Sequence, residues 1–458
     1  MEHDLIVIGG GPGGMAAARA AARAGKKPVM IQRGPIGGDC TFTGCVPSKA
    51  VIEAAATGVS FSEAMASARR AVETIAATED DDVFRREGIE VIHAWATFRS
   101  PSTLDVDGSV LTSPRIVIAT GATPAMPPIE GLADLDYLTN ENVFELDEQP
   151  STLAVLGGGA IGCELAQAFR RLGSAVTLVE GLDRLLPKEE PEASEVIADA
   201  FAAEGIDVRV GRQVTRIEPL ERKGSARLHL EGGETFVADR VLVAVGRRAA
   251  TDGLGLGAAG VATDRGFVTV DRHQATTTSG IWAVGDVTGG LQFTHAADEM
   301  GRIAVANALS SRRPRRSFDP SAIPWVTFTS PEVARVGMTE AEAAVHGGRV
   351  AYLPMSAVDR AIAAGETRGF VKLIAGPRRW LRNTGGGRIL GATVVASRGG
   401  EMIHEPALAM ATHMFTGRLA QAVHAYPTWS IAIRQAAAQL YMEIDGRTAA
   451  PARHNPRR

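Results

Sequence analysis

Cysteine is scarce in this chain, because its 458 residues contain three, and two of these, Cys40 and Cys45, lie five positions apart. The scarcity argues against a cysteine zinc site, which would require a second pair of ligands, since Cys163 is the one further cysteine. The few cysteines therefore raise the question of why two of them lie so close together.

Long apolar runs are also missing, since no stretch reaches the roughly 18 residues that a membrane-spanning helix requires. The first residues, MEHDLIVIGGGPGG, lack the positive start of a signal peptide, and their apolar run ends at glycines. Neither sign of charge dominates, because 48 basic residues stand against 52 acidic ones. We therefore expect a cytoplasmic protein that binds neither membranes nor nucleic acid.

A glycine pattern occurs twice. Residues 4–25 read DLIVIGGGPGGMAAARAAARAG, and residues 152–173 read TLAVLGGGAIGCELAQAFRRLG. In each, an apolar strand leads into G-x-G-x-x-G and an alanine-rich helix. Such glycines allow a tight turn and let a pyrophosphate approach the helix N-terminus. The pattern predicts two dinucleotide-binding folds, with their glycines at Gly9, Gly11 and Gly14 and at Gly157, Gly159 and Gly162.

The residue at the end of the next strand predicts which dinucleotide binds. In the second fold it is Glu180, whose carboxylate accepts hydrogen bonds from ribose hydroxyls and repels a 2′-phosphate. This favours NAD(H) over NADP(H). In the first fold the position is occupied by Gln32, which can still hydrogen-bond a ribose.

The two neighbouring cysteines predict redox chemistry. Residues five apart in an ideal helix are separated by about 8.6 Å at Cα, whereas a disulfide needs less than about 7 Å. A bond between Cys40 and Cys45 therefore requires a distorted turn, for which Gly44 supplies freedom. A strained disulfide in a short loop is of the reducible kind. The alternatives are a zinc site, a structural disulfide and two unpaired core cysteines. Two unpaired core cysteines would not explain the glycines before Cys40 or the VPSK sequence after Cys45.

The segment GGDCTFTGCVPSK, both glycine patterns, and the ATG, VGRR and AVGD segments together resemble the pyridine nucleotide–disulfide oxidoreductases. The resemblance implies FAD in the first fold, NAD(P)H in the second and a C-terminal dimerisation domain, and hence a homodimer. It makes Cys45 the flavin-side thiolate and Cys40 the interchange thiol. It also places Lys49 beside flavin N5, paired with Glu164.

The expected fold is α/β, with two Rossmann-like domains and a C-terminal α+β domain. We expect the FAD domain at 1–148 and 272–320, the NAD(P)H domain at 149–271, the dimerisation domain at 321–446 and a flexible tail at 447–458. We expect no resident metal. Further cofactor contacts are expected at Gly38, Thr120, Gly121, Gly246, Arg247, Gly285, Asp286, His295 and Ala296.

One segment departs from the family pattern. Thiol-processing relatives carry a histidine directly before Pro-Thr and a glutamate five residues after it, as an acid–base dyad. Here those positions are Tyr426 and Ile431, and loss of a positioned acid–base typically lowers a rate by 10²–10⁴-fold. We therefore expect a mercuric-reductase-like enzyme that passes electrons to a small molecule or metal ion, with Tyr426 at the site. The alternatives are a dihydrolipoamide dehydrogenase and a flavin-bound redox sensor or scaffold.

Overall fold

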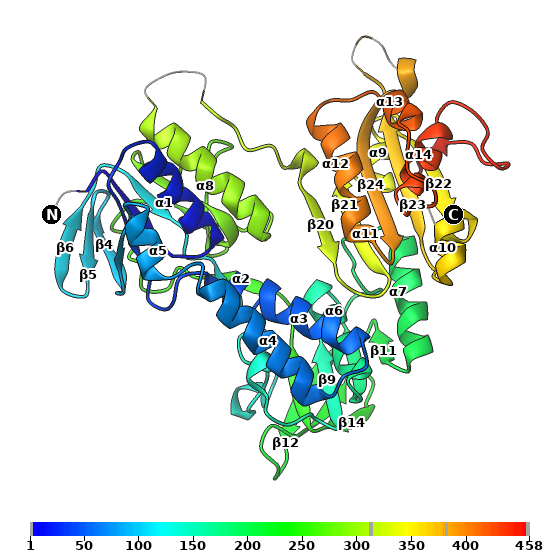
Figure 1. The fold of residues 1–458 in the computed structure, drawn as a ribbon. Coiled ribbons are helices and arrows are strands. Elements are labelled where there is room, and N and C mark those ends of the chain that lie inside the picture. The colour runs from blue at the N-terminus through cyan, green and yellow to red at the C-terminus, as the bar shows by residue number, and fades with distance from the viewer. Residues whose placement is uncertain (1–2, 311–314, 379, 381–382, 455–458) are drawn as a thin grey trace. The chain divides into compact units, whose positions relative to one another are not determined.

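The computed structural model describes residues 3–310, 315–378, 380 and 383–454 (Figure 1). The chain folds into two compact units. The first contains residues 1–127, 138–149 and 245–319, and the second contains 128–137, 150–244 and 320–458.

A five-stranded parallel sheet forms the centre of the first unit, with the order β19-β7-β1-β2-β3. Its strands are β1 (Leu5–Ile8), β2 (Pro28–Ile31), β3 (Glu90–Ile92), β7 (Ile116–Ile118) and β19 (Ile281–Ala283). The continuous apolar runs LIVI and PVMI are buried along their whole length, as expected for strands covered on both faces. Helices α1 (Pro12–Arg23) and α8 (Thr294–Leu309) lie side by side on this sheet (Figure 1).

The remaining elements of the first unit are short. Its other helices are α2 (Gly38–Phe42), α3 (Cys45–Ala56), α4 (Phe61–Ala76), α5 (Asp81–Arg86), η2 (Val143–Glu145) and η3 (Gly285–Thr288). An antiparallel sheet contains β4 (Ala96–Ser100), β5 (Thr103–Val106) and β6 (Ser109–Thr112), and two strand pairs contain β8 (Ala122–Pro124) with β16 (Arg247–Ala249) and β17 (Thr263–Asp264) with β18 (Phe267–Val268).

A second parallel sheet, β11-β10-β9-β15, begins the second unit. Its strands are β9 (Thr152–Leu156), β10 (Ala175–Glu180), β11 (Asp207–Val210) and β15 (Arg240–Val243). It is accompanied by η1 (Leu132–Asp134), α6 (Ala160–Arg171), α7 (Pro191–Glu204) and the antiparallel strands β12 (Val214–Pro219), β13 (Ala226–Leu230) and β14 (Thr235–Ala238).

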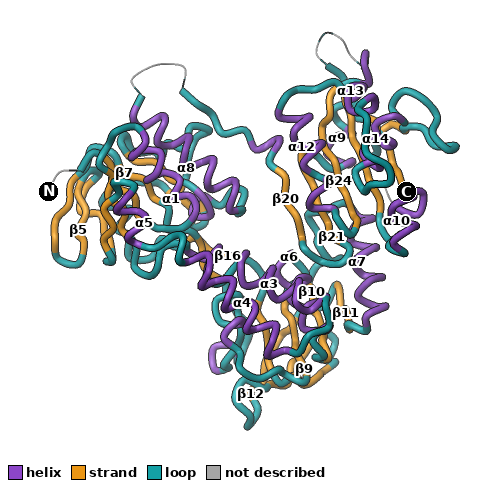
Figure 2. Tube along the Cα trace, viewed as in Figure 1, coloured by secondary structure: helices purple, strands orange, loops and turns teal. Residues whose placement is uncertain are grey.

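The C-terminal part of the second unit is a mixed layer of antiparallel strands and helices (Figure 2). The sheet order is β20-β21-β24-β23-β22-β25, with β20 (Pro324–Thr327), β21 (Glu332–Gly337), β22 (Arg349–Pro354), β23 (Phe370–Gly376), β24 (Arg388–Ala396) and β25 (Ala450–Pro451). The helices are η4 (Pro320–Ala322), α9 (Glu340–Ala344), η5 (Met355–Ala357), α10 (Asp359–Ala364), η6 (Thr384–Gly386), α11 (Gly399–Met402), α12 (His404–Ala411), α13 (Thr416–Gln421) and α14 (Ile431–Ala438). Helices α11, α12 and α14 pack on the sheet and close its apolar core.

Two expectations about boundaries differ from the structure. Residues 245–271 lie in the first unit, because β16 pairs with β8 and Leu254 and Ala259 are buried in the core of that unit. Within the segment expected to be a flexible tail, β25 pairs with β22, while residues 455–458 lie outside the described part of the chain. Among the described residues, no helix is long and apolar enough to cross a bilayer.

Candidate active site

The two glycine turns have nearly the same geometry. An added Cβ on Gly14 would lie 1.9 Å from the Gly9 carbonyl oxygen, and one on Gly162 would lie 1.9 Å from that of Gly157. These glycines are therefore needed for close packing of helix against strand. In contrast, an added Cβ on Gly11 or Gly159 would meet no atom within 4 Å. Both residues are helix N-caps without a side-chain cap, so backbone N–H groups at each turn can bind a phosphate.

Gln32 and Glu180 make the same contact in the two folds. The Gln32 side-chain oxygen accepts a 2.7 Å hydrogen bond from Gly10 N, and a Glu180 oxygen accepts a 2.6 Å hydrogen bond from Gly158 N. The other Glu180 oxygen accepts from Leu182 N at 2.7 Å. The contact with the glycine turn therefore needs an oxygen acceptor and no charge.

The expected FAD contacts lie at one edge of the first sheet. Strands β1, β2, β7 and β19 end at residues 8, 31, 118 and 283, and these contacts follow the ends directly, at Gly9, Gln32, Thr120, Gly121, Gly285 and Asp286. Ligands of doubly wound sheets bind at the carboxyl ends of the strands. The Thr120 hydroxyl is buried and has no hydrogen-bond partner in the described structure. An unpaired buried hydroxyl and open helix N-termini fit a phosphate-bearing, hydroxyl-rich cofactor such as FAD.

The cysteine segment consists of two short helices separated by a break. Cys40 lies in α2 and Cys45 begins α3, with Thr43 and Gly44 between the helices. An added Cβ on Gly44 would lie 2.7 Å from the Asp39 carbonyl oxygen, so the chain can turn back on itself here only with glycine. Gly38 is similarly close to the first fingerprint, since its Cβ would lie 3.0 Å from Gly11 Cα.

Cys40 and Cys45 are not joined to each other by a disulfide in the described structure, and a hydrogen bond with Cys45 acts on the Cys40 thiol. This hydrogen bond, followed by burial, raises the pKa of Cys40 well above the ordinary thiol value. Cys45 Sγ also lies 3.5 Å from the hydroxyl of Thr294, at the start of α8. The sequence analysis missed Thr294, although it named the next two residues, His295 and Ala296. The raised pKa therefore favours the protonated form of the Cys40 thiol.

Arg247 joins two carboxylates beside this segment. Its guanidinium contacts Asp39, the residue before Cys40, and its Nε lies 3.7 Å from Asp286. Burial raises the pKa of Asp286, and Arg247 opposes that rise. Gly246 precedes Arg247 directly and leads into β16. The role of Asp39 could not be predicted from the sequence, because its partner Arg247 lies 208 positions away.

Comparison with known proteins places these features in a family. Residues 3–301 match the family described as pyridine nucleotide-disulphide oxidoreductase, and residues 323–437 match its dimerisation domain. The chain belongs to this family. The resemblance found in the sequence and the expected fold class are thus confirmed.

Several individual oxidoreductases of this family are similar over nearly the whole chain. A mercuric reductase from Streptomyces lividans is 37% identical, with 95% of each chain covered. A dihydrolipoyl dehydrogenase from Chlorobaculum tepidum is 36% identical, with 95% of this chain and 96% of that protein covered. The HOCl-induced flavoprotein disulfide reductase RclA from Escherichia coli, solved as a Cu(II) complex, superposes with a TM-score of 0.87 at 31% identity, covering 96% of this chain and 99% of RclA.

Lys49 and Glu164 lie in different units of this oxidoreductase, Lys49 on α3 and Glu164 on α6. Glu164 is buried, and one of its oxygens accepts a 2.8 Å hydrogen bond from Phe328 N. Cys163, beside it, is fully buried, and burial raises the pKa of its thiol. The ion pair expected between Lys49 and Glu164 stays a prediction.

The segment that carries the acid–base dyad in thiol-processing members of the family is built differently here. Tyr426 is 70% exposed, and its hydroxyl donates a 2.8 Å hydrogen bond to Asp359, which raises the pKa of the phenol. Ile431 begins α14 and packs on the core. His424 Nε2 contacts Glu405 at 2.8 Å and its Nδ1 contacts the Ala422 carbonyl at 3.0 Å. Both ring nitrogens of His424 thus face hydrogen-bond acceptors, which suits a structural role better than that of a catalytic base.

Proposed function

We propose that this flavoprotein disulfide oxidoreductase is a homodimer that uses NADH to deliver two electrons through Cys40 and Cys45 to a small acceptor, in the manner of a mercuric reductase. The observation that carries the proposal is the occupation of both dyad positions by Tyr426 and Ile431, which supply no base for a thiol substrate. Acceptors that need no proton delivered to a leaving thiolate, such as a soft metal ion or a quinone, suit this site better than a disulfide does.

The residues of the first unit would hold the cofactor at the edge of the parallel sheet. The Gly11 turn would bind the pyrophosphate, and Asp286 would accept hydrogen bonds from the ribityl hydroxyls. FAD, when bound, supplies a ring that takes two electrons from NAD(P)H and gives them to the cysteine pair.

The cysteine pair then carries out the transfer to the acceptor. In the reduced pair the raised pKa of Cys40 favours its protonated form, and Cys45 would be the thiolate, as the family resemblance implies. When an acceptor is reduced, the two sulfurs form a disulfide, two electrons pass to the acceptor, and the proton of the Cys40 thiol is released. With Hg(II) as acceptor the product is Hg(0).

A screen of acceptors tests the proposal. NADH oxidation is measured with Hg(II), Cu(II), lipoamide and a quinone, and Cu(II) is included because the RclA structure is a Cu(II) complex. We expect turnover with a metal ion or quinone to exceed turnover with lipoamide. Higher turnover with lipoamide would favour the second candidate, a dihydrolipoamide dehydrogenase, which the Chlorobaculum relative supports. Turnover no faster than with oxygen alone would favour a redox sensor.

Glu180→Gln tests the preference for NADH. Glutamine keeps an oxygen for Gly158 N, as Gln32 does in the first fold, but removes the charge that repels a 2′-phosphate. A hydrogen bond to a charged group contributes about 1.5–3 kcal/mol, so the ratio of kcat/KM for NADH over NADPH should fall about tenfold or more. Arg222→Gln is the control and should leave this ratio unchanged, because the Arg222 guanidinium pairs with Asp239, away from the second glycine turn in the sequence. An unchanged ratio in Glu180→Gln would contradict the assignment.

The double variant Tyr426→His, Ile431→Glu tests the explanation for poor thiol turnover. Because the pKa of Cys40 is raised, its thiolate, which must attack the disulfide of lipoamide, forms only as the pH rises, so wild-type turnover of lipoamide should increase with pH. A restored base should raise lipoamide turnover at pH 7 by up to about 10²-fold and weaken this pH dependence. Each single variant serves as a control. No gain in the double variant would show that the missing dyad does not limit the rate.

A further inference from the structure

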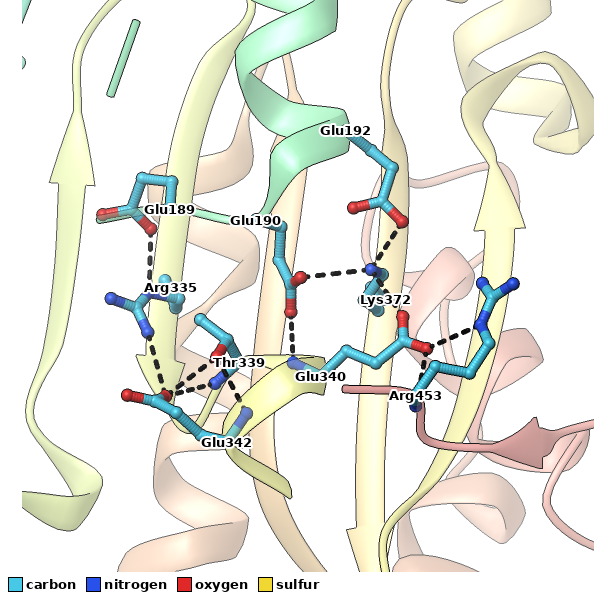
Figure 3. Close-up of polar contacts among 9 residues, drawn as sticks. All are labelled: Glu189, Glu190, Glu192, Arg335, Thr339, Glu340, Glu342, Lys372 and Arg453. Carbon is cyan, nitrogen blue, oxygen red and sulfur yellow. Dashed lines mark hydrogen bonds and ion pairs between the residues drawn. The ribbon is translucent and has the colours of Figure 1, made fainter. Parts of the chain in front are cut away.

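A buried lysine in the second unit binds three carboxylates (Figure 3). Lys372 is 1% exposed, and its ammonium lies 3.2 Å from Glu190, 2.7 Å from Glu192 and 3.0 Å from Glu340. Lys372 and Glu340 belong to the C-terminal sheet layer, on β23 and α9, whereas Glu190 and Glu192 lie at the start of α7 in the nucleotide-binding part. The lysine thus ties the two parts of the unit together.

A second buried pair strengthens the same junction. Glu189 accepts hydrogen bonds of 2.8 Å from the Trp325 indole and of 2.8 Å from Arg335 Nε, and Arg335 also donates to the Lys188 carbonyl at 2.9 Å. The Glu190 carboxylate accepts from Glu340 N at 2.7 Å. Residues 188–192 are therefore held by side chain and backbone to the C-terminal layer.

The same stretch of chain is fixed at its other end to the second glycine turn. Leu182 N donates to Glu180 at 2.7 Å, and Leu186 N donates to the Gly158 carbonyl at 2.8 Å. Leu185 packs directly on Gly158, because an added Cβ there would lie 2.8 Å from Leu185 Cδ2. Residues 181–187 thus run from the ribose-facing carboxylate to the buried cluster with contacts at both ends.

We propose that the Lys372 cluster, defined as Lys372, Glu190, Glu192 and Glu340, positions the nicotinamide dinucleotide by holding residues 181–190 in place. This inference rests on the proposed binding of NAD(P)H at Gly159 and Glu180. The side-chain hydrogen bonds and ion pairs of these four residues in the described structure join them to one another and to Arg453, and to none of the predicted cofactor contacts, so they are positioning residues. The C-terminal layer, whose recognised role is dimerisation, then also sets the affinity of the nucleotide fold.

The chemistry of the cluster favours a role in positioning the dinucleotide over a role limited to stabilising the junction. Burying Lys372 with three carboxylates is unfavourable even though Arg453 also pairs with Glu340, because one Glu192 oxygen is buried without a hydrogen-bond partner in the described structure. Apolar residues of similar volume often stabilise a junction as well or better. A charged cluster specifies one geometry, because its hydrogen bonds weaken steeply when displaced. Fixed geometry favours tight binding of a dinucleotide, because a site whose backbone donors are already in place loses less conformational freedom when the ligand binds.

The variant Lys372→Met tests the proposal in the FAD-loaded enzyme. Methionine fills the space of the lysine stem without its charge, so the three carboxylates lose their common partner and residues 188–192 are expected to shift. The Kd of NADH, measured by titration, should rise about three- to thirtyfold, as for other mutations that modulate coupling between distant sites. FAD content and kcat at saturating NADH should stay close to wild type.

A milder variant and a matched control complete the experiment. Trp325→Phe removes the indole hydrogen bond to Glu189 but keeps an aromatic ring for Arg335. It should raise the Kd less, in the same direction, so it tests the proposal if Lys372→Met does not fold. Arg209→Met removes a cation that pairs with Asp207 and Glu234 within the nucleotide-binding part and should leave the Kd unchanged. A wild-type Kd in both Lys372→Met and Trp325→Phe, whatever their Tm, would overturn the inference. Wild-type enzyme that bound neither NADH nor NADPH would overturn the proposed function and this inference with it.

Discussion

Replacing either cysteine of the pair by serine is expected to abolish acceptor reduction while the protein still binds FAD. A serine hydroxyl forms no disulfide, so the two electrons have no carrier, and we expect turnover to fall by at least about 10³-fold, as when a covalent catalytic group is removed. The measurement is NADH oxidation with the preferred acceptor, corrected for reaction with oxygen.

The two serine variants should differ in their spectra. After one equivalent of NADH, a long-wavelength charge-transfer absorbance should persist in Cys40→Ser, which retains Cys45, and should be missing in Cys45→Ser. Cys163→Ala is the control, because Cys163 is fully buried on α6 in the other unit, and it should retain turnover. Undiminished turnover in either serine variant would remove the cysteine pair from the mechanism.

Replacing Gly11 or Gly159 by alanine is expected to disrupt dinucleotide binding only in the fold that carries the substitution. Gly11 and Gly159 have φ angles of −77° and −75°, and an added Cβ meets no protein atom, so alanine is compatible with the free fold. A methyl group there would occupy the space through which a pyrophosphate approaches the backbone. Gly159→Ala should therefore weaken NADH binding by more than about 100-fold, the order expected for a misplaced substrate. Gly11→Ala should instead yield protein that does not retain FAD.

The control for these alanine variants is Gly257→Ala, because Gly257 is exposed and also has no atom near an added Cβ. Its flavin content and NADH titration should match wild type. Retention of NADH binding in Gly159→Ala, with FAD still bound, would show that the second fingerprint does not hold the dinucleotide. Circular dichroism of each variant separates loss of binding from loss of fold.

The features that could be predicted from the sequence are those whose physical cause is local. Gly14 must be glycine because it lies against Gly9 O, only five residues away, and Gly162 lies against Gly157 O in the same way. The buried strand runs and the break at Gly44 are also set by neighbours within a few positions. Such contacts recur wherever the same short pattern occurs, so reading the chain in order is enough to find them.

The tertiary structure alone decided the contacts between distant segments. Thr294 meets Cys45 across 249 positions, Arg247 meets Asp39 across 208, and Lys372 meets Glu190 across 182. No short-range pattern encodes these pairs, because a threonine, an aspartate or a lysine has the same local preferences whether or not a partner lies opposite. Chain folding brings the partners together, and burial then strengthens the electrostatic interaction between charged partners. The sequence by itself determined the nucleotide turns and the reactive sulfurs; packing decided which distant residues surround and position them.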